Sequence, residues 1–220
     1  MASALCHFPV LIPLWIALYM QQIFAPLFTP VNQATRRVPV WLIYALGAVP
    51  FAWLVVQLFA GQLGVDPVKT IEHALGEYGL YFLVGGLAVT PARKLLGLNL
   101  IKYRRAIGVL AALYITAHLA TWLVLDIQLR WGEIWTDILM RPYITIGMVS
   151  FLMILPLAFT SNNLSLRKLG PVKWRNLHKI TYIAVPLAAV HFVMIVKGWQ
   201  PEPLIWLGVI LGLLILRRLK

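Results

Sequence analysis

The sequence predicts an all-α integral membrane protein. We expect a bundle of six transmembrane helices, preceded by an apolar N-terminal extension, with both chain termini of the six-helix core on the cytoplasmic side. Of its 220 residues, 61% are hydrophobic and only 12% are charged, which is far from the average soluble domain. The basic residues lie in short clusters between long apolar runs. A net charge of +12 therefore indicates membrane topology and not a nucleic-acid partner, for which the cations would gather on one polar face.

The apolar runs give the predicted elements in chain order, because a helix needs about 20 apolar residues to cross the hydrocarbon core. An interfacial helix is expected at Glu133–Met140, and Asn162–Lys173 reads as a basic loop. Asp66-Pro67 marks a turn before the second span. The six predicted spans are Val38–Ala60, Thr70–Ala92, Ala106–Leu125, Pro142–Thr160, Leu177–Val196 and Leu204–Leu216.

Residues 1–35 are interpreted as an extension, separate from a membrane domain at residues 36–220. Residues 8–28 are apolar and uncharged, but they contain Pro9, Pro13 and Pro26. The pattern leaves open whether this segment spans the membrane, and whether Met20 is the true start.

The charge distribution orients the bundle. With this threading, fifteen of the nineteen Lys and Arg residues fall in loops on one side and four on the other, and all seven acidic residues fall on the poorer side. By the positive-inside rule, the basic side is cytoplasmic. We therefore expect a multi-pass membrane protein whose basic side is cytoplasmic, in contact with lipid.

Two histidines stand at one predicted depth on different helices. His118 follows Arg105 by thirteen residues, and His191 follows Lys179 by twelve, so each lies about 18 to 20 Å from the cytoplasmic boundary. Histidines at one depth on two helices suit the two axial ligands of a flat macrocycle such as haem. The alternative is that each histidine only bonds a carbonyl across a helix interface. The matched depth favours haem iron.

A third histidine, His178, is predicted on the same span as His191 but at its cytoplasmic edge. Two interpretations remain open: a polar residue reaching the interface, or the ligand of a second, inner cofactor. His73, at the outer mouth of the second span, is interpreted as structural.

The basic pair Arg104 and Arg105 also has two interpretations. It is either an ordinary cytoplasmic anchor, or a partner for an acidic headgroup, a propionate or a phosphate. The sequence contains neither a G-x-G-x-x-G nor a Walker pattern, so electrons or substrates have to come from outside the chain.

Several short motifs resemble one family, the MsrQ (YedZ) family of ferric-reductase-like transmembrane proteins. The resemblance covers about Val38 to Lys220. The motifs are G-V-D-P-V-K-T-I-E-H-A-L-G (Gly64 to Gly76), T-P-A-R (Thr90 to Arg93), R-R-A-I-G (Arg104 to Gly108), R-P-Y-I-T-I-G (Arg141 to Gly147), L-A-F-T-S (Leu157 to Ser161) and W-R-N-L-H-K (Trp174 to Lys179).

The resemblance implies a protein of a bacterial inner membrane that carries b-type haem, one or two, with FMN as a further cofactor. It also implies electrons from the quinone pool and delivery to MsrP, a periplasmic molybdopterin enzyme that reduces methionine sulfoxide. His118, His178 and His191 match the family's histidines. Arg104 stands where the wider superfamily places an inner histidine, which leaves the number of haems open.

The sequence thus predicts a haem-containing electron-transfer subunit. It would pass electrons from the quinone pool, or from a cytoplasmic flavin donor, to a periplasmic methionine sulfoxide reductase on which the reduction itself occurs. One alternative is a stand-alone transmembrane ferric reductase. A histidine-based proton channel or transporter is disfavoured, because the only acidic residues within the predicted spans are Glu72 and Glu77, in the polar first turns of the second span.

Overall fold

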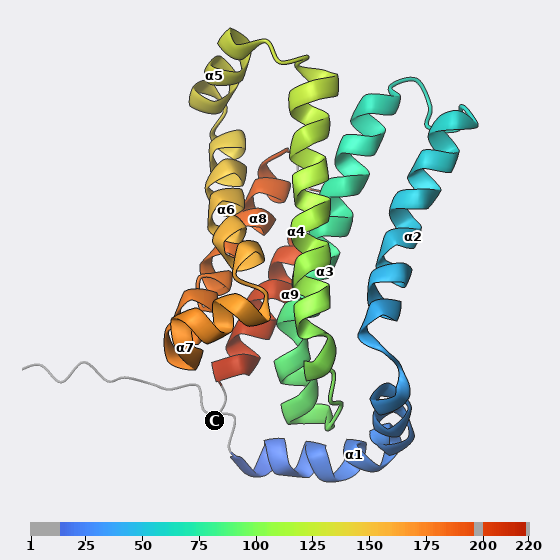
Figure 1. Ribbon diagram of the computed structural model, residues 1–220, viewed down its shortest axis with the longest axis vertical. Coiled ribbons are helices and arrows are strands. Elements are labelled where there is room, and N and C mark those ends of the chain that lie inside the picture. Colours follow the sequence, from blue (N-terminus) through green and yellow to red (C-terminus); the bar gives the residue numbers. More distant parts are fainter. Residues whose placement is uncertain (1–13, 196–199, 219–220) are drawn as a thin grey trace, which may run out of the picture.

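Helices form every regular element in residues 14–195 and 200–218, the part of the chain that the computed structural model describes. Six of them run alternately up and down a common axis and build the bundle (Figure 1). These helices are α2 (Val40–Phe59), α3 (Pro67–Leu96), α4 (Arg104–Ala120), α6 (Pro142–Phe159), α8 (Thr181–Ile195) and α9 (Pro201–Arg218).

The remaining helices cover the two ends of the bundle (Figure 1). The end with α5 (Trp131–Met140) is called the α5 end, and the end with α1 (Leu14–Arg37), α7 (Asn163–His178) and residues 97–103 is called the basic end. A short 3-10 helix, η1 (Ile101–Tyr103), leads into α4. The predicted interfacial helix at Glu133–Met140 is confirmed as α5, which begins two residues earlier.

Three helical stretches are long and apolar enough to cross a membrane: Val40–Phe59, Ile101–Asp126 and Pro142–Phe159. A fourth is added if Asn163–His178 and Thr181–Ile195, which meet at a bend of 41°, act as one span. The chain is therefore an all-helical protein with three or four apolar spans among its described residues. The six-span topology stays a prediction, with α3 and α9 running alongside these spans (Figure 1).

Helix α3 begins and ends at residues suited to those positions. The Asp66 side chain accepts a hydrogen bond from the Lys69 backbone N–H at 3.0 Å, and Pro67 occupies the first turn, where a missing N–H costs nothing. Gly97 ends the helix in the left-handed conformation, with φ of 72°. The helix is thus longer at both ends than the predicted Thr70–Ala92.

The prediction of a basic loop at Asn162–Lys173 was wrong, because residues 163–178 form α7. The Asn162 side chain caps its start by accepting from the Ser165 N–H at 2.7 Å. Gly170, with φ of 75°, kinks the helix. The prediction rested on the basic character of the segment, which is equally compatible with a helix. Since α8 begins only at Thr181, His178 and His191 lie on different helices, and the predicted single helix for both is also wrong.

Small residues let the bundle helices approach one another closely. Ala111 of α4 and Ala184 of α8 are fully buried, as is Ile210 of α9. Ser150 of α6 donates a hydrogen bond to the Ala184 carbonyl at 2.9 Å. Close contact through small and hydroxyl-bearing residues is the usual way in which membrane helices associate.

Helix α2 is fixed to α4 by a side chain that enters its hydrogen-bond ladder. The Tyr114 hydroxyl donates to the Gly47 carbonyl at 2.7 Å and accepts from the Phe51 N–H at 3.0 Å. These are the two backbone groups that would otherwise bond to each other, four residues apart. The hydroxyl therefore bridges the helices without leaving a backbone group unpaired.

Helix α1 lies across the basic end, at a large angle to the bundle (Figure 1). The Asn32 side chain donates to the Gly97 carbonyl and accepts from the Asn99 N–H, both at 2.9 Å. Lys102 donates to three carbonyls at and just past the end of α1, and the Tyr103 hydroxyl lies within hydrogen-bond distance of two of them and donates its single proton there. Part of the expected extension is thus docked on the loop before α4, while residues 1–13 lie outside the described part.

Candidate functional site

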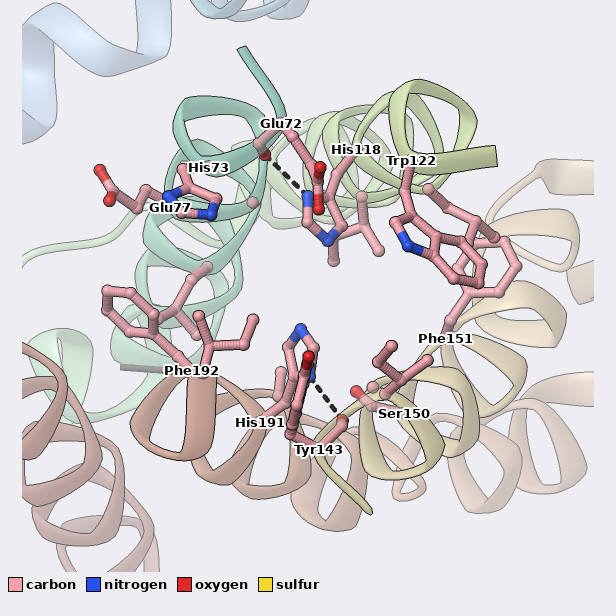
Figure 2. Close-up of a pocket in the computed structure, with 18 of the residues that line it drawn as sticks. Glu72, His73, Glu77, His118, Trp122, Tyr143, Ser150, Phe151, His191 and Phe192 are labelled. Carbon is pink, nitrogen blue, oxygen red and sulfur yellow. Dashed lines mark hydrogen bonds between the residues drawn. The ribbon is translucent and has the colours of Figure 1, made fainter. Parts of the chain in front are cut away.

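The two histidines predicted at equal depth face each other across a space in the α5 half of the bundle. His118 belongs to the last turn of α4 and His191 to α8, and their ring centres are 6.3 Å apart with the planes at 74°. Figure 2 shows the rings pointing toward one another from opposite walls. The estimate from helical rise therefore placed the pair correctly.

Each imidazole is held by one backbone carbonyl on a neighbouring helix. Nδ1 of His118 lies 2.7 Å from the Glu72 carbonyl oxygen, and Nδ1 of His191 lies 2.7 Å from the Tyr143 carbonyl oxygen. A carbonyl only accepts, so each Nδ1 must carry the proton. In the neutral ring, Nε2 then keeps its lone pair, which makes it a metal ligand whose orientation is set by the bond at the other nitrogen.

Glycines lie beside both rings. A Cβ added to Gly76 of α3 would come within 3.1 Å of His118 Nδ1, and one added to Gly147 of α6 would come within 2.8 Å of His191 Nδ1. Such contacts are closer than normal packing. Each ring therefore lies against a helix surface that is bare at that point.

The rings border a cavity of about 650 Å³, within the range of about 300 to 1,000 Å³ usual for small-molecule and cofactor sites. Its apolar wall includes Trp122, Phe151 and Phe192, which come from three different helices (Figure 2). Trp122 lies on η2 (Thr121–Asp126), where α4 widens into π-type hydrogen bonding, a feature common at functional sites.

The mouth of the cavity is charged. Lys69 at the start of α3 forms ion pairs with Asp126 at 2.7 Å and Glu72 at 3.1 Å. Burial favours the neutral amine, but the hydrogen bonds to the two carboxylates outweigh it and raise the pKa of Lys69 above its usual 10.5. Lys69 thus ties the first turn of α3 to the end of η2. Further rim residues are His73, Glu77, Arg141 and Glu202.

His178 stands apart from this site, at the basic end. Its ring stacks on Trp174 with centres 3.8 Å apart, and its Nε2 lies 3.1 Å from the Thr160 hydroxyl. That hydroxyl also lies 2.6 Å from the Pro156 carbonyl, to which it must donate, so it accepts from His178 Nε2. The structure does not bring His178 to the facing pair.

Arg104 and Arg105, at the start of α4, also lie at the basic end. Arg105 donates to the Asn163 side-chain oxygen at 2.7 Å, which links α4 to α7. Both arginines are exposed and near His178. Neither lines the cavity between the two facing histidines.

The facing pair suits one metal ion held between the rings. An imidazole nitrogen lies about 2 Å from a coordinated metal and roughly 1 Å from its own ring centre, so two rings on opposite sides of one ion have centres about 6 Å apart. The observed separation is 6.3 Å. In the described part of the chain, no group of three or more His, Cys, Asp or Glu side chains is placed to hold a metal. Two facing imidazoles beside a large apolar cavity would fit a metal whose other ligands come from a macrocycle.

The sequence reading missed the groups that hold the rings. The carbonyls of Glu72 and Tyr143 carry no side-chain signal, and the two glycines were read only as part of longer motifs. A signal did exist, because the motifs Gly64 to Gly76 and Arg141 to Gly147 both end on the glycine that faces an imidazole.

Fold and site together define a helical membrane protein in which two histidines face each other beside a largely apolar cavity. A model of the family described as "Ferric reductase like transmembrane component" matches residues 75–189. The chain belongs to this ferric-reductase-like transmembrane family.

Similar proteins from three Brucella species carry one name, "Protein-methionine-sulfoxide reductase heme-binding subunit MsrQ". The protein of Brucella anthropi is 49% identical over 181 residues, which cover 82% of each chain. Those of Brucella ovis and Brucella canis are 51% identical over 177 residues, or 80% of each chain. The motif resemblance to the MsrQ family is thereby confirmed.

Proposed function

We propose that this chain is a haem b-containing electron-transfer subunit of a methionine sulfoxide reductase system, with His118 and His191 as the axial ligands of one haem. The observation that carries the proposal is the facing pair, with ring centres 6.3 Å apart and both Nδ1 atoms bonded to carbonyls. The name shared by relatives of about 50% identity supports the same cofactor.

The chain's own residues would bind the haem, orient the two imidazoles and shield the cofactor from water. The carbonyls of Glu72 and Tyr143 hold the rings so that Nε2 faces the cavity. The aromatic wall excludes water, which favours a buried macrocycle and strengthens electrostatic interactions inside. Bound haem supplies one-electron redox chemistry, while the protein supplies ligation and surroundings.

The charged mouth suits the acidic edge of a haem. Lys69 and Arg141 both line the cavity, and cationic side chains of this kind hydrogen-bond well to carboxylates. Their existing acidic neighbours, Asp126 and Asp137, keep the rim from carrying a large uncompensated charge.

The predicted membrane orientation gives the two sides between which electrons would pass. The basic end, with α7 and the start of α4, would be cytoplasmic by the positive-inside rule, so the haem would lie in the outer half of an inner membrane. Electrons would come from the quinone pool or a cytoplasmic flavin donor, with FMN as a further cofactor, and pass to a periplasmic reductase such as MsrP. The support for these donors and for MsrP is the family resemblance.

A cofactor assay on purified protein tests the proposal directly. We expect a pyridine haemochrome spectrum of haem b with one haem per chain, and a parallel flavin measurement fixes the FMN content. His118→Ala and His191→Ala should each abolish the low-spin spectrum. His73→Ala is the matched control, since it removes a rim imidazole that is not one of the facing pair. A pigment unchanged by both substitutions in the pair would falsify the assignment.

A second assay separates the sulfoxide reductase subunit from a stand-alone ferric reductase. Reduced protein in liposomes is mixed either with an iron chelate or with a purified periplasmic reductase and oxidised peptide. We expect rapid haem reoxidation only with the reductase and peptide. Equally rapid reoxidation by the chelate alone would favour the ferric reductase instead.

A further inference from the structure

The two histidine sites share one local design, although they lie on different pairs of helices. His118 bonds the carbonyl of Glu72, and the residue four positions later in that helix is Gly76. His191 bonds the carbonyl of Tyr143, and four positions later stands Gly147. In a helix, the N–H of residue i+4 bonds the carbonyl of residue i. Each glycine is therefore the helical partner of the carbonyl that the imidazole also uses.

A carbonyl inside a helix can accept a second hydrogen bond only if a donor reaches it from the side. For both glycines, the three atoms nearest to an added Cβ are Nδ1, Cε1 and Cγ of the facing imidazole. For Gly147 these distances are 2.8, 2.9 and 3.2 Å. A methyl group at either glycine would thus occupy the place of the ring that bonds the carbonyl.

Other glycines of α3 have aliphatic neighbours instead of an imidazole. An added Cβ at Gly79 would meet Ile115 at 2.7 Å, and at Gly85 it would meet Ile107 only at 3.8 Å. These contacts are with aliphatic side chains, as expected where small residues permit close helix packing. Gly79 is as crowded as Gly147 but touches no imidazole, so it separates packing from ligand placement.

We propose that Gly76 and Gly147 are positioning residues for the two imidazoles. Each leaves its helix bare beside the carbonyl of residue i, so that the histidine of a neighbouring helix lies against the backbone, donates from Nδ1 and presents Nε2 to the cavity. The two recesses also set the ring planes, which stand at 74° to each other. That Gly76 and Gly147 make room for the imidazoles follows from the contacts alone. That this placement affects a haem ligand rests on the proposed function.

A stability experiment tests the recesses without reference to bound haem. Gly147→Ala is made in the wild-type chain, in His191→Ala and in His118→Ala, and melting temperature is measured in detergent. We expect a drop on the order of 5 °C in the wild type and in His118→Ala, where the crowded ring remains. In His191→Ala the drop should vanish, because helix propensity favours alanine once the ring is gone.

The reciprocal set uses Gly76→Ala, whose cost should vanish in His118→Ala and persist in His191→Ala. Each glycine is thus coupled to its own histidine and not to the other. If Gly147→Ala prevents accumulation of folded protein, recovery in the double variant with His191→Ala supports the proposal. Equal losses in all backgrounds would assign the glycines to helix packing and overturn it.

The second readout is the ligand field of the haem. We expect Gly76→Ala and Gly147→Ala to weaken haem retention about tenfold or more, as loss of a ligand-orienting contact commonly does. In the haem that remains, low-temperature electron paramagnetic resonance should show reduced g-anisotropy, because the signal of a bis-imidazole iron depends on the angle between the ring planes. Gly79→Ala should keep the wild-type signal, even if it lowers the melting temperature.

The outcomes separate the two proposals. Absence of haem from the wild type, or a spectrum unchanged by His118→Ala and His191→Ala, rejects the proposed function. The melting temperatures of the double variants still test whether each glycine makes room for its histidine. If haem depends on both histidines but Gly76→Ala and Gly147→Ala behave like Gly79→Ala in both readouts, only the positioning role is overturned.

Discussion

Both the α5 end and the basic end contain half-buried histidines, but the two ring nitrogens have different partners at the two ends. In the facing pair, Nδ1 is bonded to a carbonyl and Nε2 is presented to a cavity. At the basic end, His178 donates from Nε2 to Thr160 and lies flat on Trp174. An imidazole becomes a ligand when the nitrogen that faces open space is the one left unprotonated. Burial alone does not distinguish the two cases, because His118, His178 and His191 are all half-buried.

The surroundings of the histidines also differ, with open space beside the facing pair and close packing around His178. The facing pair borders a cavity of about 650 Å³ with aromatic walls. His178 is packed between an indole ring and a hydroxyl that are themselves bonded to the backbone of α6. The basic end therefore resembles an ordinary packing contact between α6, α7 and α8. The α5 end instead has an open cavity of the size that a cofactor site needs.

The largest expected difference between the ends is in haem content. His191→Ala should remove essentially all haem, because one of two axial ligands is lost. His178→Ala should leave one haem per chain. The measurement is pyridine haemochrome content per folded chain in the two variants, purified in parallel. If His178→Ala instead halves a wild-type content of two haems, the basic end holds a second site and the comparison fails.

A smaller effect is expected from Thr160→Val, which keeps the shape of the side chain but removes the acceptor for His178. Loss of this partly buried hydrogen bond should cost about 1 to 2 kcal/mol of stability. Haem content and absorption should not change. A thermal melt and a visible spectrum of the same sample give both values. Thr145→Val, near the start of α6, is a matched control, because it loses a hydroxyl hydrogen bond to the Ile138 carbonyl but touches no histidine. A red or blue shift of the haem bands would connect the basic end to the pigment.

The smallest effect is expected at the rim, from Lys69→Met. Because Lys69 is partly exposed, loss of its two ion pairs should cost only about 1 kcal/mol, together with faster loss of haem. The pKa of Lys69 is raised in the folded chain, so its contribution is complete at neutral pH and disappears only as pH rises above about 10.5. A melt series from pH 7 to pH 11 should therefore show wild type and Lys69→Met converging at the alkaline end. Curves that stay parallel would exclude the ion pairs as the cause.

Periodic and charge signals in the sequence predicted much of this molecule. Long apolar runs identified the helical membrane class, and counting residues from Arg105 and Lys179 placed His118 and His191 at one depth. Helical rise is a local property that does not depend on packing. That is why a distance along two helices could predict a contact between them.

Features that depend on tertiary contacts were not accessible in this way. The break before Thr181 separates His178 from His191, yet its only local sign is Lys179, a residue that is equally compatible with the cytoplasmic edge of one continuous helix. The carbonyls of Glu72 and Tyr143 are invisible to residue-type reasoning, because any residue supplies a carbonyl. The matching glycines acquire their meaning only when the imidazoles of other helices are placed beside them.

The corner between α1 and α2 constrains the order in which the chain can be assembled. The carbonyls at the end of α1 are bonded by Lys102 and Tyr103, which lie 64 to 68 residues further along the chain. At a synthesis rate of about 5 to 20 residues per second, these partners follow roughly 3 to 13 seconds later. During that interval the α1 end has to wait at the membrane surface without its final contacts. Docking of α1 is therefore a step that can only follow the synthesis of the segment that leads into α4, the helix that carries His118.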